Sequence, residues 1–312
     1  MITSLKVIKP GLLTTIQDIP GRKGLRKIGV PVSGTMDAHC AELANWLVGN
    51  DRKSPLLEIT LGNGEFEFSE DTVVGITGGA ANIMIGDRSV QQNKTLRAGK
   101  GERLNIGRVT KGARVYLAIA GEWSLNKISG SHSTYRAAGL GGFEGRELKS
   151  GDRIEVDVSS VNDTGRTVPK KLIPHFSQHQ KIRVIEGPEW NRLSKEQQEY
   201  MLKSRFGISS SSNRMGIRLQ SDKAIKVENS NFSSAPVIPG IVQLPPGGQP
   251  IILMNDAQSV GGYPRILKVA DADLWRLGQV WQGNEISFSL IDRKDALELL
   301  DYYRELRESH LK

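Results

Sequence analysis

The chain has 312 residues, of which 38% are hydrophobic and 6% aromatic, with 34 glycines and one cysteine. This length predicts two domains, and a single cysteine, Cys40, excludes a disulfide framework and favours a reducing cytoplasm. Lys and Arg exceed Asp and Glu by 42 to 34, but the charges are interspersed and stacking aromatics are scarce, which argues against a nucleic-acid partner. Because no stretch approaches the roughly 18 apolar residues of a membrane span and the N-terminus lacks the apolar core of a signal peptide, we expect a cytoplasmic protein without a membrane partner.

Short strands dominate the predicted elements, with Gly, Asn and Asp clusters between them, as in sandwiches and barrels. The predicted strands are residues 5–8, 56–61, 65–68, 73–77, 82–85, 103–106, 115–120, 154–158, 182–185, 217–219, 251–254 and 286–291. Helices are predicted at 38–48 and 293–312. The second carries an apolar stripe that we expect to pack on its own domain, formed by Ala296, Leu299, Leu300, Tyr303 and Leu306.

A polar, proline-containing segment at 159–179 interrupts the strand pattern and marks the domain boundary. We therefore predict an N-terminal domain at 1–160, a linker at 161–179, and a C-terminal domain with its terminal helix at 180–312.

Four glycine-rich, largely irregular segments lie inside these predicted domains, at 10–37, 129–152, 209–219 and 236–264. Long irregular segments within ordered structure usually line a site, since their backbone groups are not used in ladders. The pairs Gly141-Gly142 and Gly261-Gly262 are interpreted as places where a ligand approaches the backbone closely.

Several familiar catalytic motifs are missing from the sequence. It has no P-loop, and no glycine-rich dinucleotide fingerprint stands between a strand and a helix. The stretch GSHST, with Ser131, His132 and Ser133, lacks the second glycine of a nucleophile elbow and is interpreted as a binding loop. His175 and His179 lack a nearby Glu or Cys, so we expect no metal site.

What remains is a set of Arg, Gln, Asp and Tyr side chains within the irregular segments. Planar donors of this kind suit a small carboxylate-bearing or amide substrate, since they supply fixed hydrogen bonds. Any one of them could instead be structural, for example Arg218 as a salt-bridge partner. The candidates are Gln17, Asp18, Arg22, Arg136, Arg214, Arg218, Gln243, Asp256, Gln258 and Tyr263.

Eight segments in order across nearly the whole chain resemble one known family. They are TTIQDIPGRKG with GVPVSGTMD, ANWLVGN, LLEITL, STYRAAGLGGFEGRELKSGD, NRMGIRL, PGIVQLPPGGQPIIL and QSVGGYP. This set is similar to the biotin-dependent carboxyltransferase family, which includes the C subunit of 5-oxoprolinase, the KipI antagonist, allophanate hydrolase subunit 2 and half of the carboxyltransferase domain of urea carboxylase. The resemblance implies a mainly β fold with two tandem cyclophilin-like β-barrel domains and a C-terminal helix.

The activity that the resemblance implies first is ATP-dependent opening of 5-oxo-L-proline to L-glutamate by a complex, with ATP bound at a site that the sequence does not locate. The implied partners are a KipI-like companion (the B subunit), also described as allophanate hydrolase subunit 1, and a third protein of the lactam-utilisation type (the A subunit). One alternative is a biotin-dependent carboxyltransferase acting on urea or a related amide, and biotin is a cofactor only in that case. Another is a non-catalytic regulator like the KipI antagonist.

Roles for the candidate residues follow as expectations from this resemblance. Asp256 is expected to position groups or transfer a proton, and Gln258 and Tyr263 complete the catalytic set. The remaining candidates are expected to bind substrate, namely Arg214, Arg218, Gln243, Arg136, Gln17, Asp18 and Arg22. Two positions depart from the usual family pattern: Val260 replaces a threonine, and His132 replaces an arginine or lysine.

Overall fold

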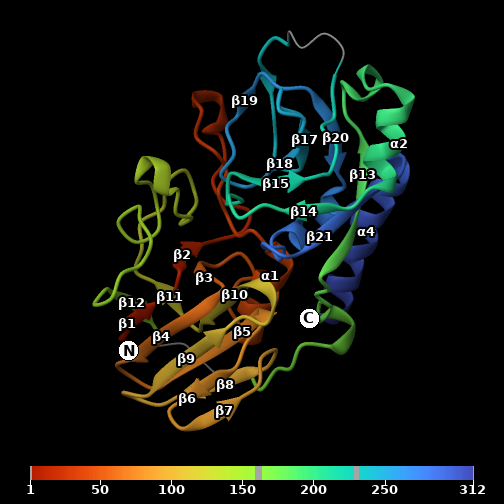
Figure 1. The fold of residues 1–312 in the computed structure, drawn as a ribbon. Coiled ribbons are helices and arrows are strands. Elements are labelled where there is room, and N and C mark those ends of the chain that lie inside the picture. The colour runs from red at the N-terminus through yellow and green to blue at the C-terminus, as the bar shows by residue number, and fades with distance from the viewer. Residues whose placement is uncertain (1, 159–163, 228–231, 312) are drawn as a thin grey trace. The chain divides into compact units, whose positions relative to one another are not determined.

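The computed structural model describes residues 2–158, 164–227 and 232–311. The chain forms two compact units (Figure 1). The first unit comprises Met1–Gly24 and Val32–Phe176, and the second comprises Leu25–Pro31 and Ser177–Lys312. Residues 161–163 of the predicted linker lie outside the described residues.

The strands of the first unit form two antiparallel sheets. The larger sheet has the order β11-β12-β1-β4-β9-β6-β7, with β1 (Ile2–Pro10), β4 (Gly62–Phe68), β6 (Ile83–Ile85), β7 (Arg88–Val90), β9 (Arg103–Arg108), β11 (Glu122–Trp123) and β12 (Arg153–Asp157). The smaller has the order β2-β3-β10-β5-β8, with β2 (Leu13–Gln17), β3 (Leu56–Thr60), β5 (Thr72–Ala80), β8 (Thr95–Ala98) and β10 (Lys111–Ile119).

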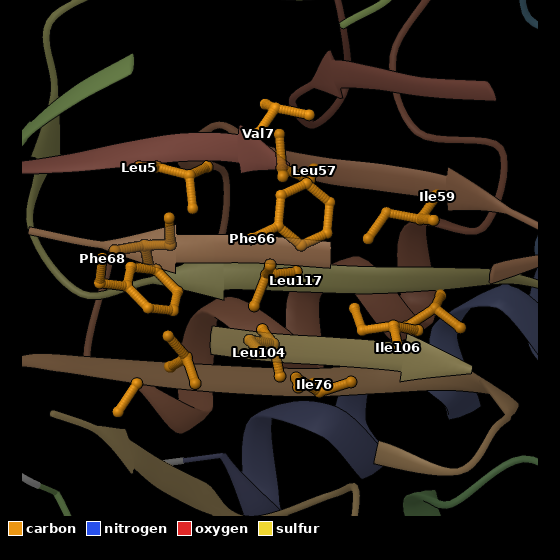
Figure 2. Close-up of a cluster of buried hydrophobic side chains, with 14 of the residues drawn as sticks. Leu5, Val7, Leu57, Ile59, Phe66, Phe68, Ile76, Leu104, Ile106 and Leu117 are labelled. Atoms are coloured by element: carbon orange, nitrogen blue, oxygen red, sulfur yellow. The ribbon is translucent and has the colours of Figure 1, made fainter. Parts of the chain in front are cut away.

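One hydrophobic core joins the two sheets of the first unit. Along β4 the buried positions alternate, so that Phe66 and Phe68 point to one face, while Leu104 and Ile106 of β9 do the same. Figure 2 shows these side chains meeting those of the other sheet, such as Ile76. Burying each side chain of this size stabilises the fold by about 1.5–3 kcal/mol. The alternation of buried and exposed residues therefore explains why the two sheets pack face to face.

The helix α1 (Ala38–Leu47) covers part of the smaller sheet of the first unit. It begins where the Asp37 carboxylate accepts a 2.9 Å hydrogen bond from Cys40 N, as an N-cap residue should. A Cβ at Gly75 of β5 would lie 2.5 Å from Ala44 O, so a glycine is required there for the helix to approach the sheet.

The second unit contains a closed seven-stranded barrel. The order is β13-β20-β17-β18-β15-β14-β21, with β13 (His179–Glu186), β14 (Phe206–Ile208), β15 (Gly216–Gln220), β17 (Ile241–Gln243), β18 (Ile251–Leu253), β20 (Arg265–Val269) and β21 (Glu285–Leu290). The barrel closes where β13 and β21 pair in parallel, with His179 opposite Glu285. A separate two-stranded ribbon is formed by β16 (Ala235–Pro236) and β19 (Val260–Gly261).

The helices that the structure describes beside the barrel are α2 (Lys195–Lys203), α3 (Leu274–Leu277) and α4 (Arg293–His310). Helix α4 runs beside β13 (Figure 1), where the Arg183 guanidinium lies 5.9 Å from the centre of the Tyr303 ring. Its predicted apolar stripe is half-buried, whereas Leu297 and Tyr302 are exposed. Among the described residues, no helix combines the length and the apolar character needed to cross a membrane.

The expected mainly β fold with a C-terminal helix is confirmed. Two segments predicted to be irregular contain strands that were not predicted: the one at 10–37 includes β2, and the one at 236–264 includes β17. The stretch LTTIQ pairs with β3 along its whole length, since its β-branched side chains suit a buried strand. Nothing in the sequence indicated that Leu25–Pro31 would group with the second unit.

Candidate functional site

The first cluster of predicted site residues lies in the first unit, around the buried Asp18. Its Oδ1 accepts hydrogen bonds from Ser131 Oγ at 2.7 Å and Ser133 Oγ at 2.5 Å, and its Oδ2 accepts one from His132 N at 2.6 Å. Asp18 is 5% exposed, and burying a carboxylate is tolerated only where donors of this kind surround it. Asp18 therefore fixes the 131–133 loop, and both serine hydroxyls donate to its carboxylate.

Arg22 holds the same loop from its other side. Its Nη1 donates to Ser33 Oγ at 3.0 Å, and its Nη2 donates to Ser133 O. The glycines beyond the loop are needed for this packing, because a Cβ at Gly141 would lie 2.7 Å from Arg22 Nη2 and one at Gly142 only 1.9 Å from Thr134 Oγ1. In the direction of a Cβ at this glycine pair, atoms of the chain itself fill the space.

Gln17 ends β2 and is fully buried. Its Nε2 donates to Thr15 Oγ1 at 3.0 Å and to Thr134 O at 3.2 Å. Its Oε1 accepts no hydrogen bond from any of the described residues. A buried acceptor without a donor costs free energy, and His132 Nδ1 is a second buried atom of this cluster without a hydrogen-bond partner among the described residues.

His132 is the histidine of the cluster, and it is 8% exposed. Burial lowers its pKa below the ordinary value by disfavouring the imidazolium, and Lys127 adds to the effect while Asp18 opposes it. The side chain is therefore biased toward the neutral imidazole. It supplies no permanent cation at the position where the family pattern has arginine or lysine.

This bias predicts how the stability of the first unit depends on pH. In the unfolded chain His132 takes up a proton near pH 6.5, whereas in the folded protein it does so only at lower pH. The contribution of His132 to the stability of the first unit is therefore fully present above pH 6.5 and is lost as pH falls through the pKa of the folded state. Between about pH 7.5 and 5.5, we expect the free energy of unfolding to fall more steeply for the wild type than for His132→Gln, as measured by urea denaturation.

The control is the exposed His175. The variant His175→Gln makes the same substitution at an exposed position and should keep the wild-type slope. Equal slopes for all three proteins would show that His132 is not held neutral.

The second cluster lies in the second unit and is built on an ion pair. Arg214 Nε and Nη2 donate to Asp256 Oδ2 and Oδ1 at 2.8 and 3.1 Å. Their side chains are 7% and 9% exposed, and the backbone adds a bond of 2.9 Å from Asp256 N to Arg214 O. This bidentate pair joins the loop before β15 to the loop after β18. Both groups were predicted to serve a substrate, yet they serve each other.

Gln243, at the end of β17, organises the loop that carries the remaining candidates. Its Nε2 donates to Tyr263 O at 3.3 Å, and its Oε1 accepts from Gln258 Nε2 at 3.4 Å. Gln243 is 1% exposed, whereas Gln258 is exposed and Tyr263 is 46% exposed. A Cβ at Gly261 would lie 2.6 Å from Gln243 Nε2, so this glycine also makes room for a side chain of the protein.

Arg136 and Arg218 belong to neither cluster. Arg136 is exposed on the first unit and forms a 2.5 Å ion pair with Glu147. Arg218 lies on β15 with an exposed side chain, while its backbone N–H bonds to Ser212 Oγ at 3.0 Å. The structure thus gathers Gln17, Asp18 and Arg22 in one unit and Arg214, Gln243, Asp256, Gln258 and Tyr263 in the other.

Sequence reasoning missed the hydroxyl groups that complete the first cluster. Ser33 binds Arg22, and Ser131 and Ser133 bind Asp18. The signal was present in GSHST, where a run of small hydroxyl residues next to glycine suits donors around a buried carboxylate. Each cluster thus holds buried, hydrogen-bonded Arg, Asp and Gln side chains on a β scaffold, and the second also carries the exposed Gln258 and Tyr263.

Comparison with known proteins shows to which family the chain belongs. Residues 28–290 match the carboxyltransferase domain family, subdomain A and B. The chain is 39% identical to the C subunit of 5-oxoprolinase from Escherichia coli over 94% of this chain and 93% of that protein. It is 35% identical to urea amidolyase of Saccharomyces cerevisiae over 92% of this chain but 16% of that protein.

A solved structure gives the same picture for the fold. The crystal structure of K. lactis urea amidolyase matches with a TM-score of 0.92 and 33% identity over 99% of this chain, which spans about a fifth of that protein. The chain belongs to the carboxyltransferase subdomain A and B family.

Proposed function

We propose that this chain is the C subunit of an ATP-dependent 5-oxoprolinase, which opens 5-oxo-L-proline to L-glutamate together with companion subunits. The observation that carries the proposal is the match to the C subunit of the Escherichia coli 5-oxoprolinase, which extends over nearly the full length of both proteins. The corresponding protein of Haemophilus influenzae matches over 91% of this chain and 90% of its own length. The urea amidolyases are several times longer than the chain.

The second cluster carries groups that could assist the opening of a lactam ring. A lactam carbonyl is a poor electrophile, so its oxygen must be activated, at the cost of ATP, before water adds to the carbon and the C–N bond opens. Charge then develops on oxygen, and oriented donors stabilise it without supplying a nucleophile. We assign substrate contact to the exposed Gln258 amide and Tyr263 phenol, and loop positioning to Gln243 and to the Arg214–Asp256 pair.

The site is completed, in this proposal, by the KipI-like B subunit and the lactam-utilisation-type A subunit, and ATP binds at the level of that complex. The alternative is biotin-dependent carboxyl transfer to urea or a related amide. It is favoured by the match of 99% of this chain to K. lactis urea amidolyase. In that case a biotin carboxylase and a biotinyl carrier are the required partners.

The test is to co-purify the chain with the proteins encoded beside it and to assay 5-oxoproline-dependent ATP hydrolysis and glutamate release. Turnover of 5-oxoproline supports the proposal. A well-folded complex that releases no glutamate but carboxylates urea with biotin would replace it by the alternative.

The Tyr263 phenol is expected to matter for this turnover. Replacing Tyr263 by phenylalanine removes one hydroxyl and should lower kcat/KM for 5-oxoproline by about 100- to 1,000-fold, the usual cost of losing one oriented donor. The matched control is Tyr302→Phe, since Tyr302 is likewise exposed, at 57%, but lies on α4. Equal activities of the two variants would remove Tyr263 from the site.

A further inference from the structure

A short strap of the chain leaves the first unit and returns to it. Leu25–Pro31 (the strap) groups with the second unit, although Gly24 and Val32 on either side belong to the first. The base of this excursion is closed by a 2.8 Å bond from Arg22 N to Val32 O. It is also tightly packed, because a Cβ at Gly21 would lie 2.3 Å from Val32 O.

A guanidinium of the strap binds the rest of the second unit. Arg26, in the short 3-10 turn Arg26–Ile28, donates from Nη2 to the carbonyl of Val237. Its Nη1 is buried and has no acceptor among the described residues. Because a buried cationic donor is costly unless it is paired, the bond to Val237 is the contact that keeps this side chain in place.

Val237 directly follows β16, in the ribbon that β16 forms with β19. The ribbon pairs only Ala235 with Gly261 and Pro236 with Val260, and Val237 N adds a 3.0 Å bond to Ser259 O. A pair of strands this short is marginal by itself. A second guanidinium supports it, as Arg265 Nη1 donates to Pro236 O at 3.3 Å while Glu189 holds Arg265 at 2.8 Å.

Along the chain, β19 of the ribbon lies between the two candidate substrate contacts. Gln258 precedes β19 by two residues, and Tyr263 follows it by two. We propose that Arg26 is a positioning residue: through Val237 it holds the β16–β19 ribbon and so fixes Gln258 and Tyr263 for substrate. The effect on turnover rests on the proposed function, whereas the effect on the ribbon does not.

Hydrogen–deuterium exchange of the full chain tests the hold on the ribbon. Arg26→Ala should speed exchange at the amides of 235, 237 and 258–263 by about tenfold, because one charge-assisted bond that opposes local opening is lost. Exchange in β18 should not change. Arg26→Lys, which keeps a donor, should restore most of the protection, and Lys27→Ala, on the same turn and exposed, should match the wild type.

Kinetics in the complex with its companion subunits test the positioning. Arg26→Ala should lower kcat/KM for 5-oxoproline about threefold or more, because the donors that stabilise the developing charge are held less firmly, and Arg26→Lys should reverse this. Unchanged exchange at the ribbon would overturn the proposal whatever the activity. Faster exchange with wild-type KM and kcat would overturn the positioning role. If the wild-type complex does not open 5-oxoproline, the proposed function fails and the exchange result decides the inference alone.

Discussion

Replacing Asp18 by alanine is expected to lower the free energy of unfolding of the first unit by about 3–5 kcal/mol. The carboxylate is buried and accepts from two hydroxyls and one backbone N–H. Its removal leaves Ser131 Oγ, Ser133 Oγ and His132 N without their acceptor, and each buried donor left in this way costs about 1–3 kcal/mol. Asp18→Asn should cost less, because one carbonyl oxygen remains.

Urea denaturation read by exchange protection of the amides of β3 and β10 measures this effect in the first unit alone. The matched control is Asp87→Ala, since Asp87 is exposed in the turn between β6 and β7, and its loss should stay within about 0.5 kcal/mol. A loss for Asp18→Ala no larger than that of the control would mean that the loop at 131–133 is held by its glycine packing instead.

Strand periodicity explains how much of the fold could be predicted. Where burial alternates, as in β4 and β9, the pattern is visible in the sequence. β2 was missed because it is buried at four of its five positions and lies in a glycine-rich surrounding. Helix α2 was not predicted. Ser194 caps it by accepting a 3.3 Å hydrogen bond from Gln197 N, and the Ser-x-x-Gln spacing in the sequence indicates such a helix start.

The candidate site was predictable in its residue types but not in its pairings. Arg, Gln and Asp in irregular segments indicated fixed hydrogen bonds, and most of these residues do form them. The sequence cannot tell which donors the protein uses internally, because Arg214 and Asp256 are 42 positions apart and meet only through the barrel. Likewise, nothing in the sequence around Arg26 indicates a bond to a carbonyl 211 residues away.

The Arg214–Asp256 pair is expected to be strongly coupled in a double-mutant cycle. Either Arg214→Met or Asp256→Ala leaves a buried charge without its partner and should cost about 3–5 kcal/mol in the free energy of unfolding of the second unit. The double variant leaves neither charge, so it should cost less than the sum of the single variants by about 2–3 kcal/mol. Urea denaturation read by exchange protection of β15 and β18 measures each corner of the cycle.

The chain offers an exposed pair of the same chemistry as the control for this cycle. Arg136 and Glu147 are 48% and 38% exposed, and water screens such a pair, so their coupling should stay below about 1 kcal/mol. The comparison also decides the role of Asp256. If Asp256→Ala destabilises the second unit and lowers turnover to the same degree as Arg214→Met does, the pair positions the loops. If Asp256→Ala is as stable as the wild type and loses turnover, its carboxylate reacts with substrate, and the role in proton transfer expected from the sequence is restored.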